Sequence, residues 1–334
     1  GSTGSKAASI FVPVVNLGWY TIQAATYGHF VAQVFHMGQV GEGICMAVSA
    51  IVMGIFAMCG IGAITILGYI AIPAIVFLSI ATAIRSLGVI GGMEALFAYV
   101  PSSDMPLFTG ITAVIGTWVL STATCIADIM RYAKDTKAAV SATLTGLLGG
   151  NILMIVCGAI AAIAMQNSDL TVILLGFGLV IPSLILMTTN IFTTNAANLY
   201  STSLNLSNAF KMERKKMLAI LLVLSALATL TKPYEIGFLF TFLNILGTVV
   251  PPLSGIILSD YFLVHKGHYA AYDKASFCKW NPVPWITWAI SIALVYMIPF
   301  GLPSLNGIIL GAVLYTALMA ISKQRVTTNL AEEA

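Results

Sequence analysis

Long apolar runs separated by short polar breaks make up most of the chain. A spanning helix needs about 20 mostly apolar residues to cross a hydrocarbon layer of about 30 Å. The pattern also predicts a tight turn at Gly60-Ile61-Gly62, a short interfacial helix within 90–100, and a short helix before the crossing in 170–205, with Pro182 in its first turn. The ten predicted spanning helices cover 8–35, 43–59, 61–84, 107–130, 138–165, 178–205, 215–231, 236–263, 283–299 and 303–322.

Composition and charge support a membrane protein. Of the 334 residues, 59% are hydrophobic and 8% are charged, whereas a soluble protein carries about 25% charged residues. If the chain starts on the cytoplasmic side, the ten spans place thirteen Lys and Arg residues inside and only Arg85 and Lys232 outside, in agreement with the positive-inside rule. We expect a multi-pass inner-membrane protein with both ends of this chain cytoplasmic. Because the chain starts at Gly1, we expect an amino-terminal part to be absent.

Several function classes are not supported. The net charge of +3 offers no basic field for nucleic acid, and the five cysteines show no CxxC spacing, so reduced thiols are favoured over a metal site. The chain has no phosphate-binding GxxxxGK[ST] loop, no HExxH, no GxSxG and no TVGYG filter. We therefore expect neither an enzyme nor a potassium-type channel, no cofactor and no obligate protein partner, with the lipid bilayer as surroundings.

Polar and aromatic side chains share one face of the first predicted span. Asn16, Trp19, Tyr20, Gln23 and Tyr27 follow helical spacing. One interpretation is hydrogen bonding between helices together with interfacial aromatic rings. The other is a pocket wall for a flat polar ligand, in which Asn16 supplies a hydrogen-bonding group and Trp19 a stacking face.

Two other spans carry polar groups at mid-membrane depth, where unsatisfied groups are costly. The stretch 116–124, rich in Gly, Ser and Thr around Trp118, favours either a discontinuous helix that exposes its backbone or small-residue packing. In the sixth span, Asn190, Thr193 and Thr194 share a face. Their oxygens with freed backbone carbonyls suit Na⁺, and without a carboxylate a divalent ion is not expected; the alternative is a polar seam between helices.

The charged and kinked positions have local interpretations. Pro251 and Pro252 predict a bend, either static or a gate. Asp260 is a proton or gate residue, a partner for Lys266, or a solvated carboxylate at the end of a helix. Asp128 and Arg131, one turn apart, are expected to pair with each other, and His29 and His36 to be ordinary interfacial residues.

Motifs in the same order along the chain resemble the cytosine permeases of the nucleobase:cation symporter-1 family. The sixth-span motif, from Asn190 to Tyr200, resembles the signature of that family, and the resemblance extends over essentially the whole chain. The other motifs are Asn16-Leu17-Gly18-Trp19, Gly60-Ile61-Gly62-Ala63-Ile64-Thr65, Thr117-Trp118 with Ala127-Asp128-Ile129-Met130-Arg131-Tyr132, and Val250-Pro251-Pro252-Leu253-Ser254-Gly255 with Asp260-Tyr261.

The resemblance implies an all-α integral membrane protein with the LeuT-type inverted-repeat (5+5) transporter fold. Family members have twelve spans, and by motif this chain begins at the third, so about ten are expected here. Residues 1–334 then form a single transporter domain, with core helices at about 8–263 and two accessory helices at about 283–322.

The resemblance also implies a binding site. Trp19 and Trp118 would stack a base, and amides and backbone groups would read its edges. The Thr193 and Thr194 hydroxyls with the Asn190 carbonyl would hold Na⁺ as half a site, since the absent first helix supplies the remaining ligands in the family. The groups implied to read the base are Asn16, Asn190, Asn195 and the backbone around Gly116 and Thr117.

The implied function is secondary transport of a nucleobase by alternating access, coupled to Na⁺ or H⁺. Cytosine permeases usually have Gln where this chain has Asn16 and Phe where it has Trp118, so the pocket is expected to differ in size. Cytosine is therefore the leading substrate, followed by hydroxymethylpyrimidine, uracil, purines and hydantoin or allantoin. The alternative is a truncated membrane protein that does not transport.

Overall fold

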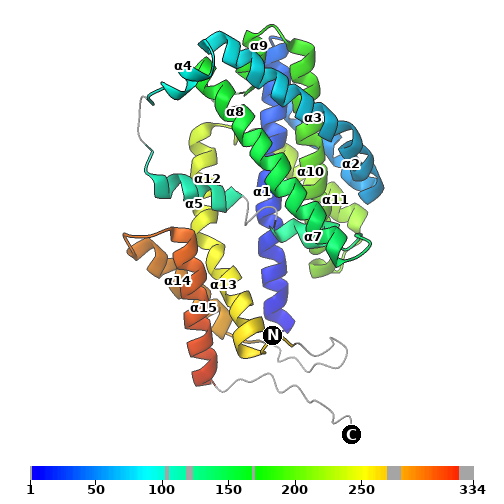
Figure 1. The fold of residues 1–334 in the computed structure, drawn as a ribbon. Helices are drawn as coiled ribbons and strands as arrows, with labels where there is room; N and C mark the ends of the chain where they lie inside the picture. The colour runs from blue at the N-terminus through cyan, green and yellow to red at the C-terminus, as the bar shows by residue number, and fades with distance from the viewer. Residues whose placement is uncertain (1, 102–104, 118–122, 168–169, 269–279, 323–334) are drawn as a thin grey trace. The chain divides into compact units, whose positions relative to one another are not determined.

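The computed structural model describes residues 2–101, 105–117, 123–167, 170–268 and 280–322, and their regular secondary structure is entirely helical (Figure 1). Two segments, η2 and η3, are π-helices. The elements are α1 (Ser2–Val34), α2 (Gln39–Met58), α3 (Ile61–Ile90), α4 (Met93–Phe97), α5 (Leu107–Thr117), α6 (Ala123–Met130), α7 (Thr136–Leu144), η2 (Thr145–Asn151), α8 (Ile152–Met165), α9 (Leu170–Gly176), α10 (Val180–Phe210), α11 (Arg214–Thr229), α12 (Ile236–Val249), α13 (Pro251–Ser259), η3 (Asp260–Val264), α14 (Val283–Met297) and α15 (Pro303–Ser322).

The helices follow the predicted spans, apart from 118–122 in the fourth span, which lies outside the described residues. The tight turn between α2 and α3 is confirmed: Gly60 has a φ of +83°, which glycine adopts without a Cβ penalty. The short helix α4 lies within 90–100. The short helix α9 precedes α10, and Pro182 lies in the first turn of α10, where its missing N–H breaks no bond.

The predicted interruption at the two prolines is also present. α12 ends at Val249 and α13 begins at Pro251, because proline cannot donate the hydrogen bond that would continue the first helix. Further along, the helix passes into η3, in which each turn contains one extra residue. Whether the interruption acts as a gate stays a prediction.

The chain forms two compact units, each assembled from separate stretches. Unit 1 comprises Gly1–Val15, Met105–Thr124 and Ile236–Ala334, and unit 2 comprises Asn16–Asp104 and Cys125–Glu235. Unit 1 therefore contains α5 and the helices from α12 to α15, whereas unit 2 contains α2 to α4 and α7 to α11.

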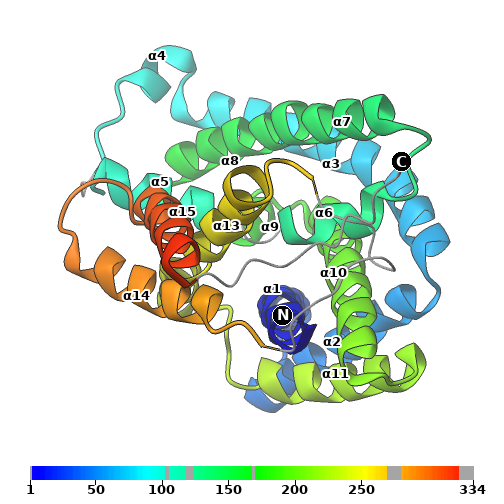
Figure 2. The same cartoon turned by 90° about the horizontal axis from the view of Figure 1, so that it is seen from below.

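Unit 2 is built by close packing of helices. α3 packs against α8 and α10, and α2 packs against α11 and α10 (Figures 1 and 2). Ser79, Thr82 and Ser86 are all buried on α3. Their spacing places them on one face, and small side chains allow neighbouring helices to approach closely.

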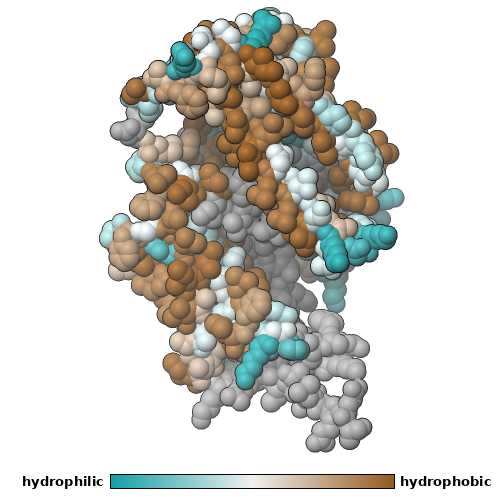
Figure 3. Space-filling model, viewed as in Figure 1, coloured by the Kyte–Doolittle hydropathy of each residue, from teal (hydrophilic) through white to brown (hydrophobic). Residues whose placement is uncertain are grey.

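The outer surface of these helices is apolar. Ile66, Tyr69 and Phe77 of α3 are 63%, 78% and 72% exposed, and Figure 3 shows a mostly hydrophobic surface over α3 and α8. Among the described residues, five helical stretches are long and apolar enough to cross a membrane. Contiguous apolar surface of this extent requires lipid around it. The five stretches are Gln39–Met58, Ile61–Ile90, Thr136–Met165, Ile236–Val264 and Pro303–Ser322.

In unit 1, α13 and α15 pack at backbone distance. A Cβ at Gly311 would lie 2.2 Å from the carbonyl oxygen of Pro252, and a Cβ at Gly255 would lie 2.1 Å from that of Ile308. Glycine is therefore required at both positions because the two helices touch there, and not because the backbone turns. A buried cluster completes the packing beside them, made of Ile256, Val283, Tyr315 and Met319.

We predict that Gly311→Ala destabilises the protein by about 1–3 kcal/mol, because the added methyl group must displace the backbone of α13. Gly158→Ala in α8 is the matched control, since a Cβ there meets nothing within 4 Å and alanine favours the helix. Thermal unfolding of the purified protein in detergent measures both. Equal midpoints for the two variants would contradict the close approach.

Candidate functional site

Two tyrosines of the polar and aromatic face predicted for the first span hold α1 against its neighbours in unit 2. The Tyr20 hydroxyl donates to the carbonyl of Ala50 in α2. The Tyr27 hydroxyl lies 2.8 Å from the Thr188 Oγ1 of α10, and its ring meets the Phe192 ring edge-on with centroids 5.4 Å apart. For Tyr20 and Tyr27, the interpretation as bonding between helices therefore fits.

Asn16 and Trp19 precede Tyr20 by four residues and by one residue. Their exposed fractions are 0% and 9%, so an amide and an indole are held next to each other in an environment with little water. Gln23 continues the face, and its buried Oε1 has no hydrogen-bond partner in the part of the chain that the structure describes. Asn16, Trp19 and Gln23 therefore place a flat ring and two amide groups on one face of α1, which are the groups that recognition of a heterocycle uses.

The predicted ion ligands lie on an uninterrupted helix. α10 runs from Val180 to Phe210 without a break. The Thr193 hydroxyl donates to the carbonyl oxygens of Thr189 and Asn190, both at 2.9 Å, and the Thr194 hydroxyl donates to that of Asn190 at 3.1 Å. The freed backbone carbonyls expected for this stretch are therefore not seen in α10.

These hydrogen bonds suit the oxygens to a cation. A hydroxyl carries one proton and two lone pairs. In Thr193 and Thr194 the proton is directed to the backbone of the same helix, which leaves the lone pairs to accept a positive charge. Asn190 is half-buried and Thr194 is exposed, so the set is not sealed within the core of unit 2. Neutral oxygens of this kind are ligands that Na⁺ accepts, but the assignment of these residues to an ion stays a prediction.

Asn195 occupies a different place on α10. It is 0% exposed, and its Nδ2 donates to the Tyr20 carbonyl at 3.0 Å and to the Met53 sulfur at 3.3 Å. These contacts join α10 to α1 and α2, so the structure gives Asn195 a packing role. Its Oδ1 and the nearby Asn198 Nδ2 are buried and have no partner among the described residues.

The fourth predicted span is only partly described. α5 ends at Thr117, directly after Gly116, and α6 begins at Ala123. Trp118 lies outside the described residues. The assignments of Gly116, Thr117 and Trp118 to the substrate therefore stay predictions.

The predicted ion pair between Asp128 and Arg131 is wrong. The Asp128 carboxylate instead accepts hydrogen bonds from the Ser201 hydroxyl and, at 3.0 Å, from the Asn205 amide of α10. Ser201 and Asn205 are one turn apart, so both reach the same carboxylate. A contact across helices replaces the local pair because α10 presents two donors to α6.

Arg131 joins a separate group of tyrosines. Its Nη2 donates to the hydroxyl oxygens of Tyr132 at 2.9 Å and Tyr200 at 3.1 Å. The hydrogen bond from Tyr200, and then the Arg131 guanidinium, lower the pKa of Tyr132 below its ordinary value. The Arg214 guanidinium lies over the Tyr200 ring, 4.6 Å from its centroid. Together these contacts fasten the end of α6 to α10 and α11.

The alternative in which Asp260 pairs with Lys266 is also wrong. In unit 1 the Tyr315 hydroxyl donates to Asp260 Oδ1 at 2.6 Å, and His265 Nδ1 lies 3.5 Å from Oδ2. The π-helical turn of η3 brings His265 back onto Asp260, which separation in sequence alone does not show. Asp260 thus links the start of η3 to α15.

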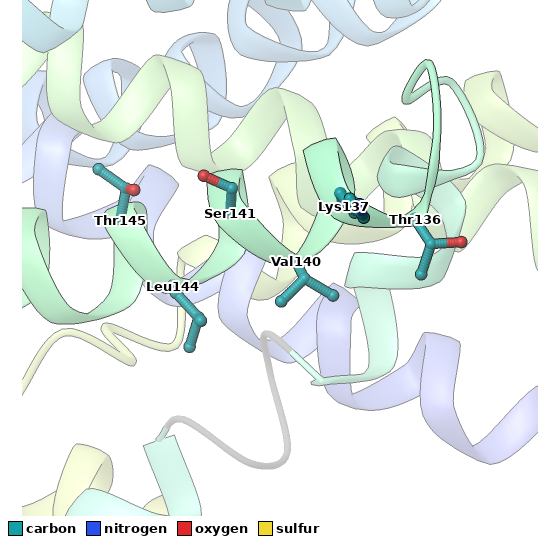
Figure 4. Close-up of a pocket in the computed structure, with 6 residues that line it drawn as sticks. All are labelled: Thr136, Lys137, Val140, Ser141, Leu144 and Thr145. Carbon is teal, nitrogen blue, oxygen red and sulfur yellow. The ribbon is translucent and has the colours of Figure 1, made fainter.

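A surface hollow lies elsewhere, along the start of α7 (Figure 4). All of its lining residues come from one helical stretch, so it presents a single wall, and none of them is a predicted site residue. We therefore do not assign it to a substrate. The lining residues are Thr136, Lys137, Val140, Ser141, Leu144 and Thr145.

Sequence comparisons connect this arrangement with permeases. The model of the family described as "Permease for cytosine/purines, uracil, thiamine, allantoin" matches residues 1–319. The cytosine permease of Escherichia coli strain K12 is 28% identical over 330 residues, which cover 99% of this chain and 77% of the relative. The hydantoin permease of Microbacterium maritypicum is 28% identical over 242 residues, which cover 64% of this chain and 49% of the relative.

A solved structure shares the fold. Mhp1, a nucleobase-cation-symport-1 family transporter, in a closed conformation with bromovinylhydantoin bound, aligns with a TM-score of 0.79 at 20% identity. The alignment covers 100% of this chain and 79% of that chain. The predicted LeuT-type transporter fold is confirmed.

We predict that Asn195→Leu lowers the stability of the protein by about 1–3 kcal/mol, because the Tyr20 carbonyl and the Met53 sulfur lose their buried donor. Asn208→Leu is the control, since Asn208 is an exposed amide on the same helix. Thermal unfolding in detergent and equilibrium binding of cytosine are measured together. Unchanged stability with weakened binding would instead make Asn195 a ligand contact.

Proposed function

The chain belongs to the family of permeases for cytosine/purines, uracil, thiamine and allantoin, and from this we propose that it imports a nucleobase, with cytosine as the leading candidate. Transport proceeds by alternating access and is coupled to Na⁺ or H⁺. The observation that carries the proposal is the match of the cytosine permease over 99% of this chain. The hydantoin permease matches over 64%, so a hydantoin is the second candidate.

Trp19 and Asn16 are the proposed centre of substrate recognition. Stacking of a base on an aromatic ring is worth about 1–3 kcal/mol, but it discriminates poorly between bases because every base has a π-face. The choice of base therefore depends on amide hydrogen bonds, for which Asn16 and Asn190 are proposed. The burial of the Asn16 amide supports this role, since a site built to hydrogen-bond a ligand rejects analogues that leave its polar groups unpaired.

The remaining residues of the predicted site keep supporting roles in the proposal. The Trp118 ring is proposed as a second stacking face, with the backbone of Gly116 and Thr117 beside it. The indole at position 118 and the short amide at position 16 differ from the residues usual in cytosine permeases. This difference supports testing several heterocycles rather than cytosine alone.

Na⁺ is the proposed coupling ion, held in part by the Thr193 and Thr194 hydroxyls and the Asn190 carbonyl. The support is chemical: the described oxygens are neutral, they are hard donors, and the threonine protons are directed to the helix backbone. Neutral oxygens match a monovalent ion better than a divalent one, which normally recruits carboxylates.

We predict that labelled cytosine enters proteoliposomes faster with an inward Na⁺ gradient, and that Thr193→Val raises the Na⁺ concentration for half-maximal uptake at least about tenfold, the effect of about 1.4 kcal/mol. Thr241→Val is the matched control, because the exposed Thr241 hydroxyl makes the same kind of bond to its own helix, to Gly237 at 2.8 Å. Uptake that follows a proton gradient and ignores Na⁺ would reject the ion assignment.

We predict that Trp19→Ala weakens cytosine binding by about 5- to 150-fold, the loss that corresponds to about 1–3 kcal/mol of stacking. Trp280→Ala removes an indole that is 50% exposed and should leave affinity unchanged. Isothermal titration of the detergent-purified protein with cytosine, uracil and hydantoin measures both variants. Equal affinity in wild type and Trp19→Ala would remove Trp19 from the site.

A further inference from the structure

Three side chains from two other parts of unit 2 contact the Glu42 carboxylate, and a fourth contacts one of the three. The group is named here the Glu42 cluster: His29, Gln33, Glu42, Lys232 and Tyr234. The Tyr234 hydroxyl donates to Glu42 Oε1 at 2.6 Å, and His29 Nδ1 lies 2.8 Å from the same oxygen. Lys232 Nζ lies 3.4 Å from Oε2. The Glu42 side chain is only 13% exposed, so these partners replace much of its water.

Both ring nitrogens of His29 have a hydrogen-bond partner, and the face of its ring is stacked. Its ring stacks on Tyr234, with centroids 4.2 Å apart and planes 20° from parallel. Its second nitrogen, Nε2, lies 2.7 Å from the Gln33 Nε2. The sequence interpretation of His29 as an ordinary interfacial residue missed these contacts, and its place at the interface stays a prediction. The partners of Glu42 lie 13, 190 and 192 positions away along the chain, so no local pattern indicates them.

The cluster fastens a particular piece of chain. Lys232 and Tyr234 belong to the turn 230–235, which begins after α11 ends at Thr229. Unit 2 ends at Glu235, and the chain enters unit 1 at Ile236, where α12 begins. Glu42 thus connects the last residues of unit 2 to α1 and α2, just before the chain passes into unit 1.

The turn itself is adapted to this contact. Lys232 has a φ of +55°, which is uncommon outside glycine, and the next residue, Pro233, is buried. The Lys232 N–H donates to the Thr229 carbonyl at 3.0 Å, and the Glu235 N–H to that of Lys232 at 3.2 Å. Burial, followed by the hydrogen bond to Glu42, raises the pKa of Tyr234, so its hydroxyl keeps the proton that it donates.

An ordinary surface ion pair looks different in this protein. Glu213 and Lys216 approach to 3.7 Å, but their side chains are 59% and 74% exposed and lie on adjacent turns. Pairs of that kind contribute little because water competes for both charges. Glu42 instead receives hydrogen bonds from two other segments, so its loss leaves several groups without their partner.

We propose that Glu42 is a positioning residue, whose cluster anchors the connection 230–235 within unit 2 and so fixes the point from which the chain continues into unit 1. The anchor itself is independent of substrate. Its consequence for the transport cycle rests on the proposed function: the anchored connection sets the rate at which the two units change their arrangement, without touching the substrate.

The test compares wild type, Glu42→Gln and Glu213→Gln by hydrogen–deuterium exchange of the purified full chain without substrate. We expect the amides of Lys232 and Glu235 to exchange at least about tenfold faster in Glu42→Gln, the effect of losing a hydrogen bond to a charged group, with the centres of α2 and α11 unchanged. Tyr234→Phe, which keeps the ring stacking, should show a smaller increase. Glu213→Gln should resemble wild type.

Unchanged exchange in the turn would overturn the proposal, as would an equal rise throughout unit 2, which signals general destabilisation. In uptake assays Glu42→Gln should lower the turnover of cytosine with an unchanged KM. A raised KM with normal turnover would overturn the positioning role. If wild type takes up no tested base, the proposed function fails, and exchange alone still decides whether the anchor exists.

Discussion

Polar groups inside apolar helices need partners within the protein, and much of this structure depends on that constraint. Lipid offers no hydrogen bonds to an amide, hydroxyl or carboxylate. Threonines along several spans accordingly donate to their own helix, as Thr26, Thr82 and Thr112 do at 2.9, 2.7 and 2.8 Å. Side chains that cannot be satisfied locally must reach another helix. Each polar side chain inside the helices is therefore a potential hydrogen-bonded link to another helix.

The hydrogen bonds that link the helices of unit 2 differ between the helix centres and the helix ends. Within the helices, single neutral hydrogen bonds predominate, such as that from Asn195 to the Tyr20 carbonyl. Near the helix ends, charged groups collect several partners, as Glu42 and Asp128 do. Charged side chains are less costly near water than at the centre of a bilayer, so strong anchors are placed where the chain turns. The helix centres are left with weaker, neutral hydrogen bonds, and the residues of the proposed substrate and ion site lie among them.

The elements were predictable because their signals are local. Apolar length gives the spans, Gly60 supplies the positive φ of a turn, and two adjacent prolines interrupt a helix wherever they occur. The partners of charged groups were not predictable in the same way. Asp128 and Arg131 have the spacing of an ion pair, yet the carboxylate bonds to Ser201, 73 positions away. The helix that supplies the donor is determined by tertiary packing, which the spacing of residues within one helix does not indicate.

The amides of α10 show the same limit at the candidate site. Asn190 and Asn195 are identical in type and share one motif, but five residues turn an α-helix by about 140° beyond a full turn. The two side chains therefore leave the helix in different directions: Asn195 enters the packing with α1 and α2, while Asn190 remains half-buried beside Thr193 and Thr194. Because α10 is continuous through this region, the face with Asn190 and the face with Asn195 keep a fixed orientation relative to each other. In the proposed site, a substrate or ion on the Asn190 face would therefore lie on the same continuous helix as the Asn195 contact with α1.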